Sequence, residues 1–185
     1  NDFNNAKQSF KVYNRYSQNM LKVQSSRFMI CLCMFELTLG HPKDQSATYD
    51  ALEELQIFIE EYPNSKYDFE ATEKIESLRN KLALKKYEIA KLYIKSENFD
   101  SAKIYLDQLL NQYYDTDSAD DARIGYIIIF LMTEGLTAAD KYLSDNEKNF
   151  NLELKYLEAR NIIQNSEKNF RIKKLYFLDY INKLL

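Results

Sequence analysis

Few side chains of this 185-residue sequence could take part in catalysis or hold a metal ion. His41 is the single histidine, and it precedes Pro42 at an expected helix end, where a turn residue is favoured over a catalytic base. Cys31 and Cys33 stand two positions apart, so on a helix they point to nearly opposite sides and cannot bridge each other. Structural zinc needs four ligands. We therefore expect no metal site and interpret both cysteines as small core residues.

Three pairs of adjacent carboxylates could suggest general acid–base chemistry, which needs two groups that converge on one substrate. The pairs are Glu53–Glu54, Glu60–Glu61 and Asp120–Asp121. Adjacent helical positions diverge by about 100°, so we interpret these carboxylates as solvated or first-turn charges of helices. The three glycines are far apart and form neither a dinucleotide-binding loop nor a P-loop. The sequence thus predicts a protein that is not an enzyme and has no cofactor.

The composition indicates an all-α protein, because 3 Gly and 2 Pro are too few for the turns of a multi-stranded β protein. The net charge of −3 argues against nucleic-acid binding, which needs clustered Lys and Arg. A short basic group, Arg171, Lys173 and Lys174, is interpreted as a solvated helix face. The longest apolar run, 28–39, is shorter than the about 20 residues of a membrane-spanning helix and predicts a buried core helix.

Apolar residues recur every three or four positions through almost the whole chain, which predicts a succession of helices. Ser46 is the expected N-cap of the third helix, and Ser65 with Asp68 resembles a capping box. Asn98 is expected to separate the fourth helix from the fifth. The expected helices span 3–16, 20–39, 46–62, 68–97 (one long helix or two joined end to end), 99–113, 118–134, 137–148, 152–164 and 167–185.

The sequence also repeats itself, since Tyr62 and Ala71 have counterparts in Tyr113 and Ala122, each pair 51 positions apart. A small residue stands four positions before a large one in four segments, which lets two helices cross closely and is typical of the second helix of a tetratricopeptide repeat. The pairs are Ala6 and Phe10, Ala51 and Leu55, Ala102 and Leu106, and Ala139 and Leu143. We predict an all-α fold, an α-solenoid of tetratricopeptide-type helical hairpins. Residues 1–185 are expected to form a single array of about four hairpins with an incomplete first repeat.

Residues 44–116 resemble the middle and C-terminal part of the BamD family, the tetratricopeptide-repeat lipoproteins of the outer-membrane β-barrel assembly machinery. The most telling pieces are DQSATYDA, EYPNSKY and SLRNKLALKKYEIAKLYIKSENFDSA, and their order and spacing carry the resemblance. Two positions depart from the family pattern. Tyr114 stands where the repeat usually has Pro, and Tyr105 stands where some relatives place an Arg that contacts the barrel subunit. Beyond about residue 150 the resemblance is weak.

This resemblance implies a non-enzymatic scaffold at the periplasmic face of the outer membrane. The family is anchored through a lipidated N-terminal cysteine, which we expect to precede residue 1 together with about one repeat or more. The implied partners are the periplasmic domains of the barrel-forming subunit and unfolded outer-membrane proteins, with no nucleic acid and no membrane contact except the anchor. The alternative is a generic tetratricopeptide-repeat adaptor, periplasmic or cytoplasmic, that captures a short peptide in its concave groove.

The expected partner-binding surface is the hairpin 92–108, which the resemblance places in the half that meets the barrel subunit. Aromatic and uncharged polar side chains are concentrated there, and interface centres favour such residues because they bury much area at low desolvation cost. The expected contact residues are Tyr93, Ser96, Asn98, Tyr105 and Gln108. Most other Tyr and Phe residues fall on the helical stripes and are interpreted as core.

Overall fold

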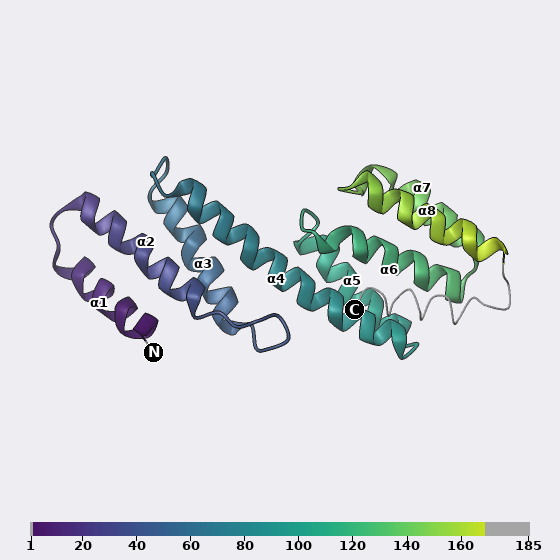
Figure 1. The fold of residues 1–185 in the computed structure, drawn as a ribbon, viewed down its shortest axis with the longest axis horizontal. Coiled ribbons are helices and arrows are strands. Elements are labelled where there is room, and N and C mark those ends of the chain that lie inside the picture. Colours follow the sequence, from purple (N-terminus) through teal and green to yellow (C-terminus); the bar gives the residue numbers. More distant parts are fainter. Residues whose placement is uncertain (1, 169–185) are drawn as a thin grey trace. The chain divides into compact units, whose positions relative to one another are not determined.

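The computed structural model describes residues 2–168, and every regular element among them is a helix (Figure 1). The elements are α1 (Asp2–Tyr16), α2 (Met20–Glu36), α3 (Ser46–Glu61), α4 (Asp68–Lys95), α5 (Phe99–Gln112), α6 (Ser118–Thr133), α7 (Leu136–Asp145), the short 3-10 helix η1 (Glu147–Asn149) and α8 (Glu153–Lys168). The all-α helical-repeat fold is thereby confirmed, and α4 is one continuous helix. Most of the last predicted helix, 167–185, with its basic group, lies outside the described residues.

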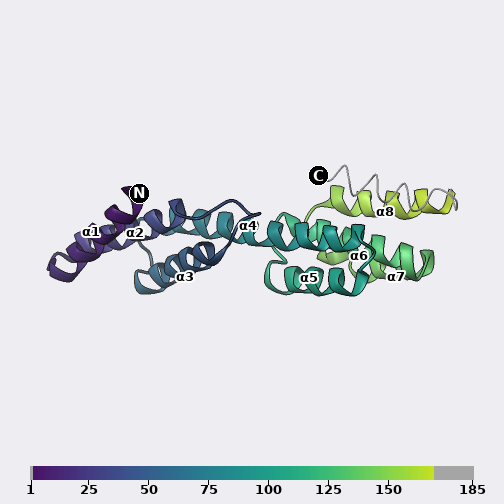
Figure 2. The same ribbon diagram turned by 90° about the horizontal axis from the view of Figure 1, so that it is seen from below.

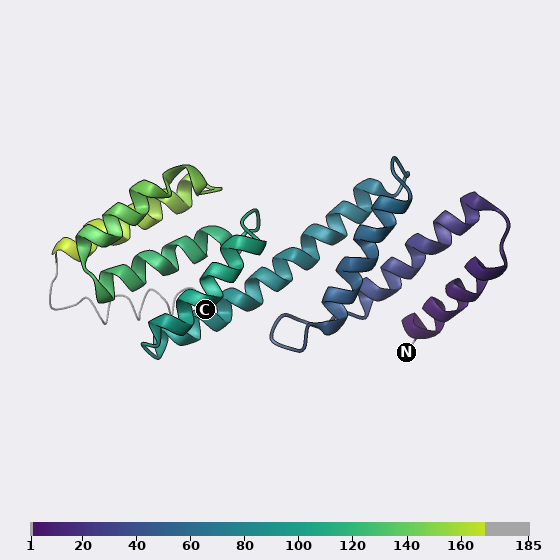
Figure 3. The ribbon, with the colours of Figure 1, turned by 180° about the vertical axis from the view of Figure 1, so that it is seen from behind.

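The chain divides into two compact units, Asn1–Leu82 and Ala83–Leu185, and each is described by itself. In the first unit α1 and α2 form an antiparallel hairpin, and α3 packs against α2 (Figure 3). In the second unit α6 contacts α5, α7 and α8, with α5 and α8 on opposite sides of it (Figure 2). The prediction that residues 1–185 form one array stays a prediction.

The core of the first unit joins α2, α3 and the beginning of α4. The ring of Phe28 stacks on that of Tyr67 with centroids 4.5 Å apart, and Phe58 lies 5.3 Å from Phe28. Burial of such side chains stabilises the fold by about 1.5–3 kcal/mol each. Cys31 and Cys33 are both buried and not in a disulfide, which confirms that they are core residues. The core cluster consists of Phe28, Cys31, Ala51, Leu55, Phe58, Ala71 and Leu78.

The second unit is built around α6, in which most side chains are buried. Gly125 allows the close approach of its neighbours, because a Cβ atom there would lie 3.3 Å from Leu106 Cδ2 and 3.6 Å from Ile94 Cδ1. Ala102 and Ala139 are fully buried, as the small-then-large pattern predicted. Ala6, in α1, is only half-buried.

Two predicted helix caps are wrong in detail. Ser46 is the first residue of α3 and not its N-cap, a position that Gln45 takes. The side chain of Gln45 instead fixes the preceding loop, because its Nε2 donates to the carbonyls of Gly40 and Lys43. Ser65 is no part of a capping box, since its hydroxyl accepts the N–H of Tyr67, just before α4 begins. The predicted break between the fourth and fifth helices at Asn98 is confirmed. The structure adds that Asn98 caps α5, because its Oδ1 accepts the N–H of Ser101.

Asp120 is a first-turn charge of α6, which is one of the two interpretations given for these carboxylates. It is not solvated, however, because its side chain is buried and 1% of the residue is exposed. Its carboxylate accepts a hydrogen bond from Arg123 Nη1 at 2.7 Å and one from the N–H of Leu152 at 2.8 Å. It also accepts the N–H of Asn151 at 3.0 Å. Asp120 thus holds the residues just before α8 against the beginning of α6.

Candidate partner-binding surfaces

The hairpin of α4 and α5 turns through only three residues, 96–98. Glu97 adopts the left-handed conformation with a φ of 59°, and the N–H of Asn98 donates to the carbonyl of Tyr93 at 2.9 Å. The hydroxyl of Ser96 donates to the same carbonyl at 3.1 Å, and Asn98 caps α5. Ser96 and Asn98 are exposed, yet both already serve the backbone of this turn.

The other three predicted contact residues lie along the seam between the two helices. The rings of Tyr93 and Tyr105 stack with centroids 5.6 Å apart at 20°, and both residues are half-buried. Farther along the seam, Lys86 Nζ donates to Gln108 Oε1 at 2.9 Å. Burial lowers the pKa of the Lys86 ammonium below its usual value. The structure therefore brings Tyr93 and Tyr105 together and places Gln108 with Lys86, whereas a partner's contact with them stays a prediction.

Two exposed apolar residues on this hairpin escaped the sequence reasoning. Leu92, an apolar residue of the predicted helix 68–97, is 64% exposed, and Ile104 is 56% exposed. Lys91 takes the inner position instead, where its Nζ pairs with Glu88 Oε1 at 2.6 Å. Here the polar residue Lys91 faces inward and the apolar residue Leu92 faces outward. Apolar periodicity predicts the opposite orientation, so the sequence pattern alone does not show this arrangement.

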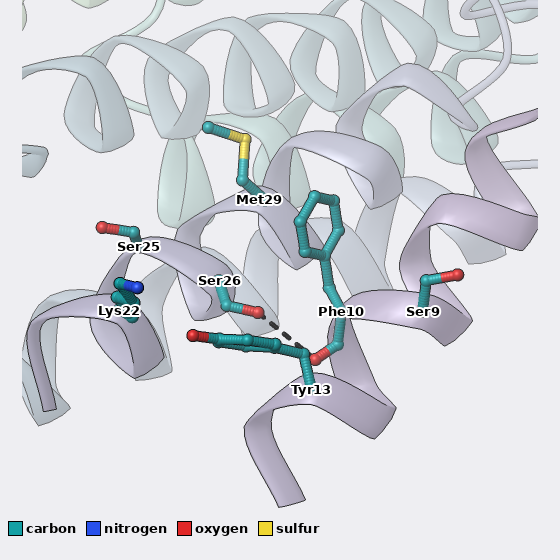
Figure 4. Close-up of a pocket in the computed structure, with 7 residues that line it drawn as sticks. All are labelled: Ser9, Phe10, Tyr13, Lys22, Ser25, Ser26 and Met29. Carbon is teal, nitrogen blue, oxygen red and sulfur yellow. Dashed lines mark hydrogen bonds between the residues drawn. The ribbon is translucent and has the colours of Figure 1, made fainter. Parts of the chain in front are cut away.

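A second surface, which the sequence did not predict, is a groove between α1 and α2 (Figure 4). It has a volume of about 410 Å³. The ring of Phe10 stands beside Met29, and the ring of Tyr13 extends from α1 toward α2 (Figure 4). The hydroxyl of Ser26 donates to the carbonyl of Phe10 at 3.2 Å and ties the two helices together below the groove. The lining residues are Ser9, Phe10, Tyr13, Lys22, Ser25, Ser26 and Met29.

The surroundings of this groove are apolar and basic. α1 has no buried residue, and several of its large apolar side chains are exposed. Residues 2–29 contain five basic side chains and one acidic side chain, Asp2, although the whole chain carries a net charge of −3. One of the five, Arg27, is neutralised by ion pairs with Glu54 and Glu61. The remaining four are Lys7, Lys11, Arg15 and Lys22.

Residues 2–168 contain no group of three or more His, Cys, Asp and Glu side chains that could hold a metal ion. Burial raises the pKa of the Cys31 thiol to about 12, with the charge of Glu54 as the next cause, so this thiol stays protonated and unreactive at neutral pH. None of the helices in the described part of the chain combines the length and apolar character needed to cross a membrane.

Short antiparallel helices with small residues at their crossings define a helical-repeat protein of the tetratricopeptide type. The chain belongs to the family described as "YfiO: Outer membrane lipoprotein", whose model matches residues 1–145. This family membership confirms the resemblance found in the sequence. It also confirms that the chain is not an enzyme.

A relative from Caulobacter vibrioides, named "Outer membrane protein assembly factor BamD", is 33% identical to the chain over 73 residues. The match covers 40% of this chain and 24% of the relative, so the chain spans about a quarter of the length of the curated protein that it matches.

Proposed function

We propose that this chain is a scaffold subunit of the machinery that assembles β-barrel proteins in the outer membrane. The observation that carries the proposal is the family match over residues 1–145, and the name of the Caulobacter relative, an assembly factor, supports it. The same two observations support a location at the periplasmic face of the outer membrane. The proposed partner is the barrel-forming subunit, bound through its periplasmic domains.

We further propose that the hairpin of α4 and α5 makes this contact. Its stacked pair, Tyr93 and Tyr105, is already ordered in the free chain, so little side-chain entropy is lost when a partner covers it. Leu92 and Ile104 add exposed apolar area on the same two helices, which favours a protein partner. Ser96 and Asn98 keep the turn in shape, and their exposed side chains are expected at the polar rim of the contact.

The test is a calorimetric titration of the Tyr105→Ala variant with the periplasmic domains of the barrel-forming subunit. We expect binding to weaken by about 1 kcal/mol or more, which is about fivefold in Kd, because an aromatic contact is truncated. Tyr105→Phe keeps the ring and should retain most of the affinity.

Tyr49→Ala is the matched control, because Tyr49 is an exposed tyrosine on α3 of the other unit and should leave the affinity unchanged. Circular dichroism confirms that each variant is folded. Full-strength binding by folded Tyr105→Ala would place the interface elsewhere.

A further inference from the structure

We propose that a pocket beside the beginning of α6 binds the phosphate group of a small organic phosphate. The pocket belongs to the second unit and is lined by residues from the end of α5, from α6 and from the segment around η1. None of its lining residues belongs to the surface proposed for the barrel-forming subunit. This inference therefore goes beyond the proposed function and does not depend on it.

The positive charge of the pocket comes from Arg123 and Lys148. Arg123 lines the pocket although only 6% of the residue is exposed, and its guanidinium is fixed between Asp120 and the ring of Phe150. Lys148 is exposed and has no ion-pair partner among residues 2–168. No carboxylate of these residues lines the pocket. The two cations therefore favour an anionic ligand.

Most of the donors of Arg123 remain available for such a ligand. A guanidinium has five N–H groups, and in the described part of the chain its one hydrogen bond runs from Nη1 to Asp120. The Asp120 carboxylate also accepts the N–H groups of Asn151 and Leu152 and does not itself line the pocket. The planar fork of an arginine matches the oxygens of a phosphate or a carboxylate.

Three asparagine side chains add further donors, and each is held in place by a hydrogen bond. Nδ2 of Asn146 donates to the carbonyl of Tyr142 at 2.9 Å, and Nδ2 of Asn149 donates to Asn146 Oδ1 at 3.0 Å. Nδ2 of Asn151 donates to the carbonyl of Tyr114 at 3.0 Å. An amide nitrogen has two N–H groups, so each of these side chains keeps one for a ligand. The donors are thus oriented before a ligand arrives, which lowers the entropy cost of binding.

The number of donors favours a phosphate group over a carboxylate. A carboxylate has two oxygens with about four acceptor positions. A phosphate group has three terminal oxygens and carries about 1.5–2 negative charges at pH 7. It can therefore accept from Arg123, Lys148 and the asparagine amides together, and it gains more from the two cations than a single negative charge does.

The rest of the pocket indicates that the phosphate is part of a larger molecule. The volume of about 400 Å³ lies in the range of small-molecule pockets, about 300–1,000 Å³. Leu110 and Tyr114 also line it and offer apolar contacts to an organic group beside the phosphate. Tyr114 stands where the repeat usually has Pro, so this ring is a departure of the chain from the repeat pattern. A phosphorylated glycerol has this combination of groups, either free in solution or as a lipid headgroup.

The proposal is tested by calorimetric titration of residues 1–185 with glycerol 3-phosphate, inorganic phosphate and acetate. We expect glycerol 3-phosphate to bind at least about tenfold more tightly than acetate, because it accepts more hydrogen bonds and carries more charge. It should also bind about threefold more tightly than inorganic phosphate, because its carbon chain contacts the apolar part of the pocket. Added salt should weaken the binding of both phosphates.

Three substitutions localise the binding. Lys148→Glu reverses a charge at an exposed position and should weaken glycerol 3-phosphate about tenfold. Asn149→Asp replaces a donor by a carboxylate and should weaken it about fivefold. Arg123→Lys keeps a cation beside Asp120 but loses the planar fork, and it should weaken the ligand about tenfold.

The matched controls are Lys141→Glu and Asn161→Asp. Both change exposed residues of the same unit that do not line the pocket, so they should leave the affinity unchanged. Circular dichroism shows whether each variant is folded. Lys148→Glu tests the proposal even if Arg123→Lys does not fold, because Lys148 is exposed.

Vesicles of phosphatidylcholine with phosphatidic acid distinguish the two sources of the phosphate. If glycerol 3-phosphate binds and the vesicles capture the wild-type chain but not Lys148→Glu, the ligand is a lipid headgroup. If glycerol 3-phosphate binds and the vesicles do not, the ligand is a soluble organic phosphate. The proposal is overturned if glycerol 3-phosphate does not bind, if acetate binds as tightly, or if folded Lys148→Glu keeps the wild-type affinity.

Discussion

Asp120 shows how one buried carboxylate organises the second unit. It pairs with Arg123 three residues along α6, and it also accepts the backbone N–H groups of Asn151 and Leu152, more than 30 residues away. Arg123 also lies over the ring of Phe150, 5.8 Å from its centroid. The local sequence predicts a first-turn charge at Asp120. It does not predict the hydrogen bonds to Asn151 and Leu152, because the spacing of apolar residues contains no information about contacts between distant segments.

Removal of this carboxylate should therefore destabilise the fold strongly. In Asp120→Ala, the Arg123 guanidinium would remain buried without its counter-ion, and the two N–H groups would lose their acceptor. We expect the free energy of unfolding to fall by about 3–5 kcal/mol, measured by urea denaturation. Asp140→Ala, at an exposed position of α7, should change it by less than about 0.5 kcal/mol. A loss below about 1 kcal/mol in Asp120→Ala would contradict this role.

At the scale of helices, much of the fold could be predicted because it depends on local pattern. The stripe of apolar residues located α1 to α8, and Asn98 marked the beginning of α5 correctly. The predicted interruption after residue 164 is wrong, because α8 continues to Lys168, and the short helix η1 was not predicted as a separate element. The details that failed depend on competing side chains. Gln45 rather than Ser46 precedes α3 because its amide is held by the preceding loop. Lys91 rather than Leu92 faces inward because Glu88 neutralises it.

The candidate surfaces could be predicted only in part, because they depend on which helices pack against each other. The composition of the hairpin 92–108 singled out Tyr93 and Tyr105, and their ring contact places them together. The groove between α1 and α2 was missed, because the stripe Phe3, Phe10 and Tyr13 predicts an amphipathic helix equally well whether a neighbour covers it or not. Burial by a neighbour is a tertiary property that spacing alone does not contain.

The helix crossing at Ala102 provides a test at this scale. Ala102 is fully buried in α5, so Ala102→Phe should overpack the core and lower the free energy of unfolding by about 1–3 kcal/mol. Ile104→Phe, at an exposed position of the same helix, is the control and should be nearly neutral. Thermal melts followed by circular dichroism measure both variants. An unchanged melting midpoint in Ala102→Phe would show that this site tolerates a large side chain.

Across the whole molecule, several buried weak acids share one electrostatic property. Burial raises the pKa of the Cys31 thiol to about 12. Burial also raises the pKa values of the Tyr87 and Tyr142 hydroxyls. For Tyr126, burial is again the main cause, and a hydrogen bond to Asp107 raises the pKa further. Cys31 lies in the first unit and the three tyrosines lie in the second, so the ionisation of these groups affects the stability of both units.

We therefore expect the protein to lose stability as the pH rises above about 9. In the unfolded chain, thiols and phenols release their protons near pH 8.5 and 10, whereas the folded protein retains them to higher pH. The unfolded state then binds fewer protons, so the free energy of unfolding falls by up to about 1.4 kcal/mol per pH unit for each such group. Urea denaturation at pH 8 and pH 10.5 measures the loss. Cys31→Ala, although less stable at pH 8 because of its cavity, should lose less stability between these two values than the wild-type chain. An equal loss in both proteins would show that the Cys31 thiol ionises in the folded state as readily as in the unfolded chain.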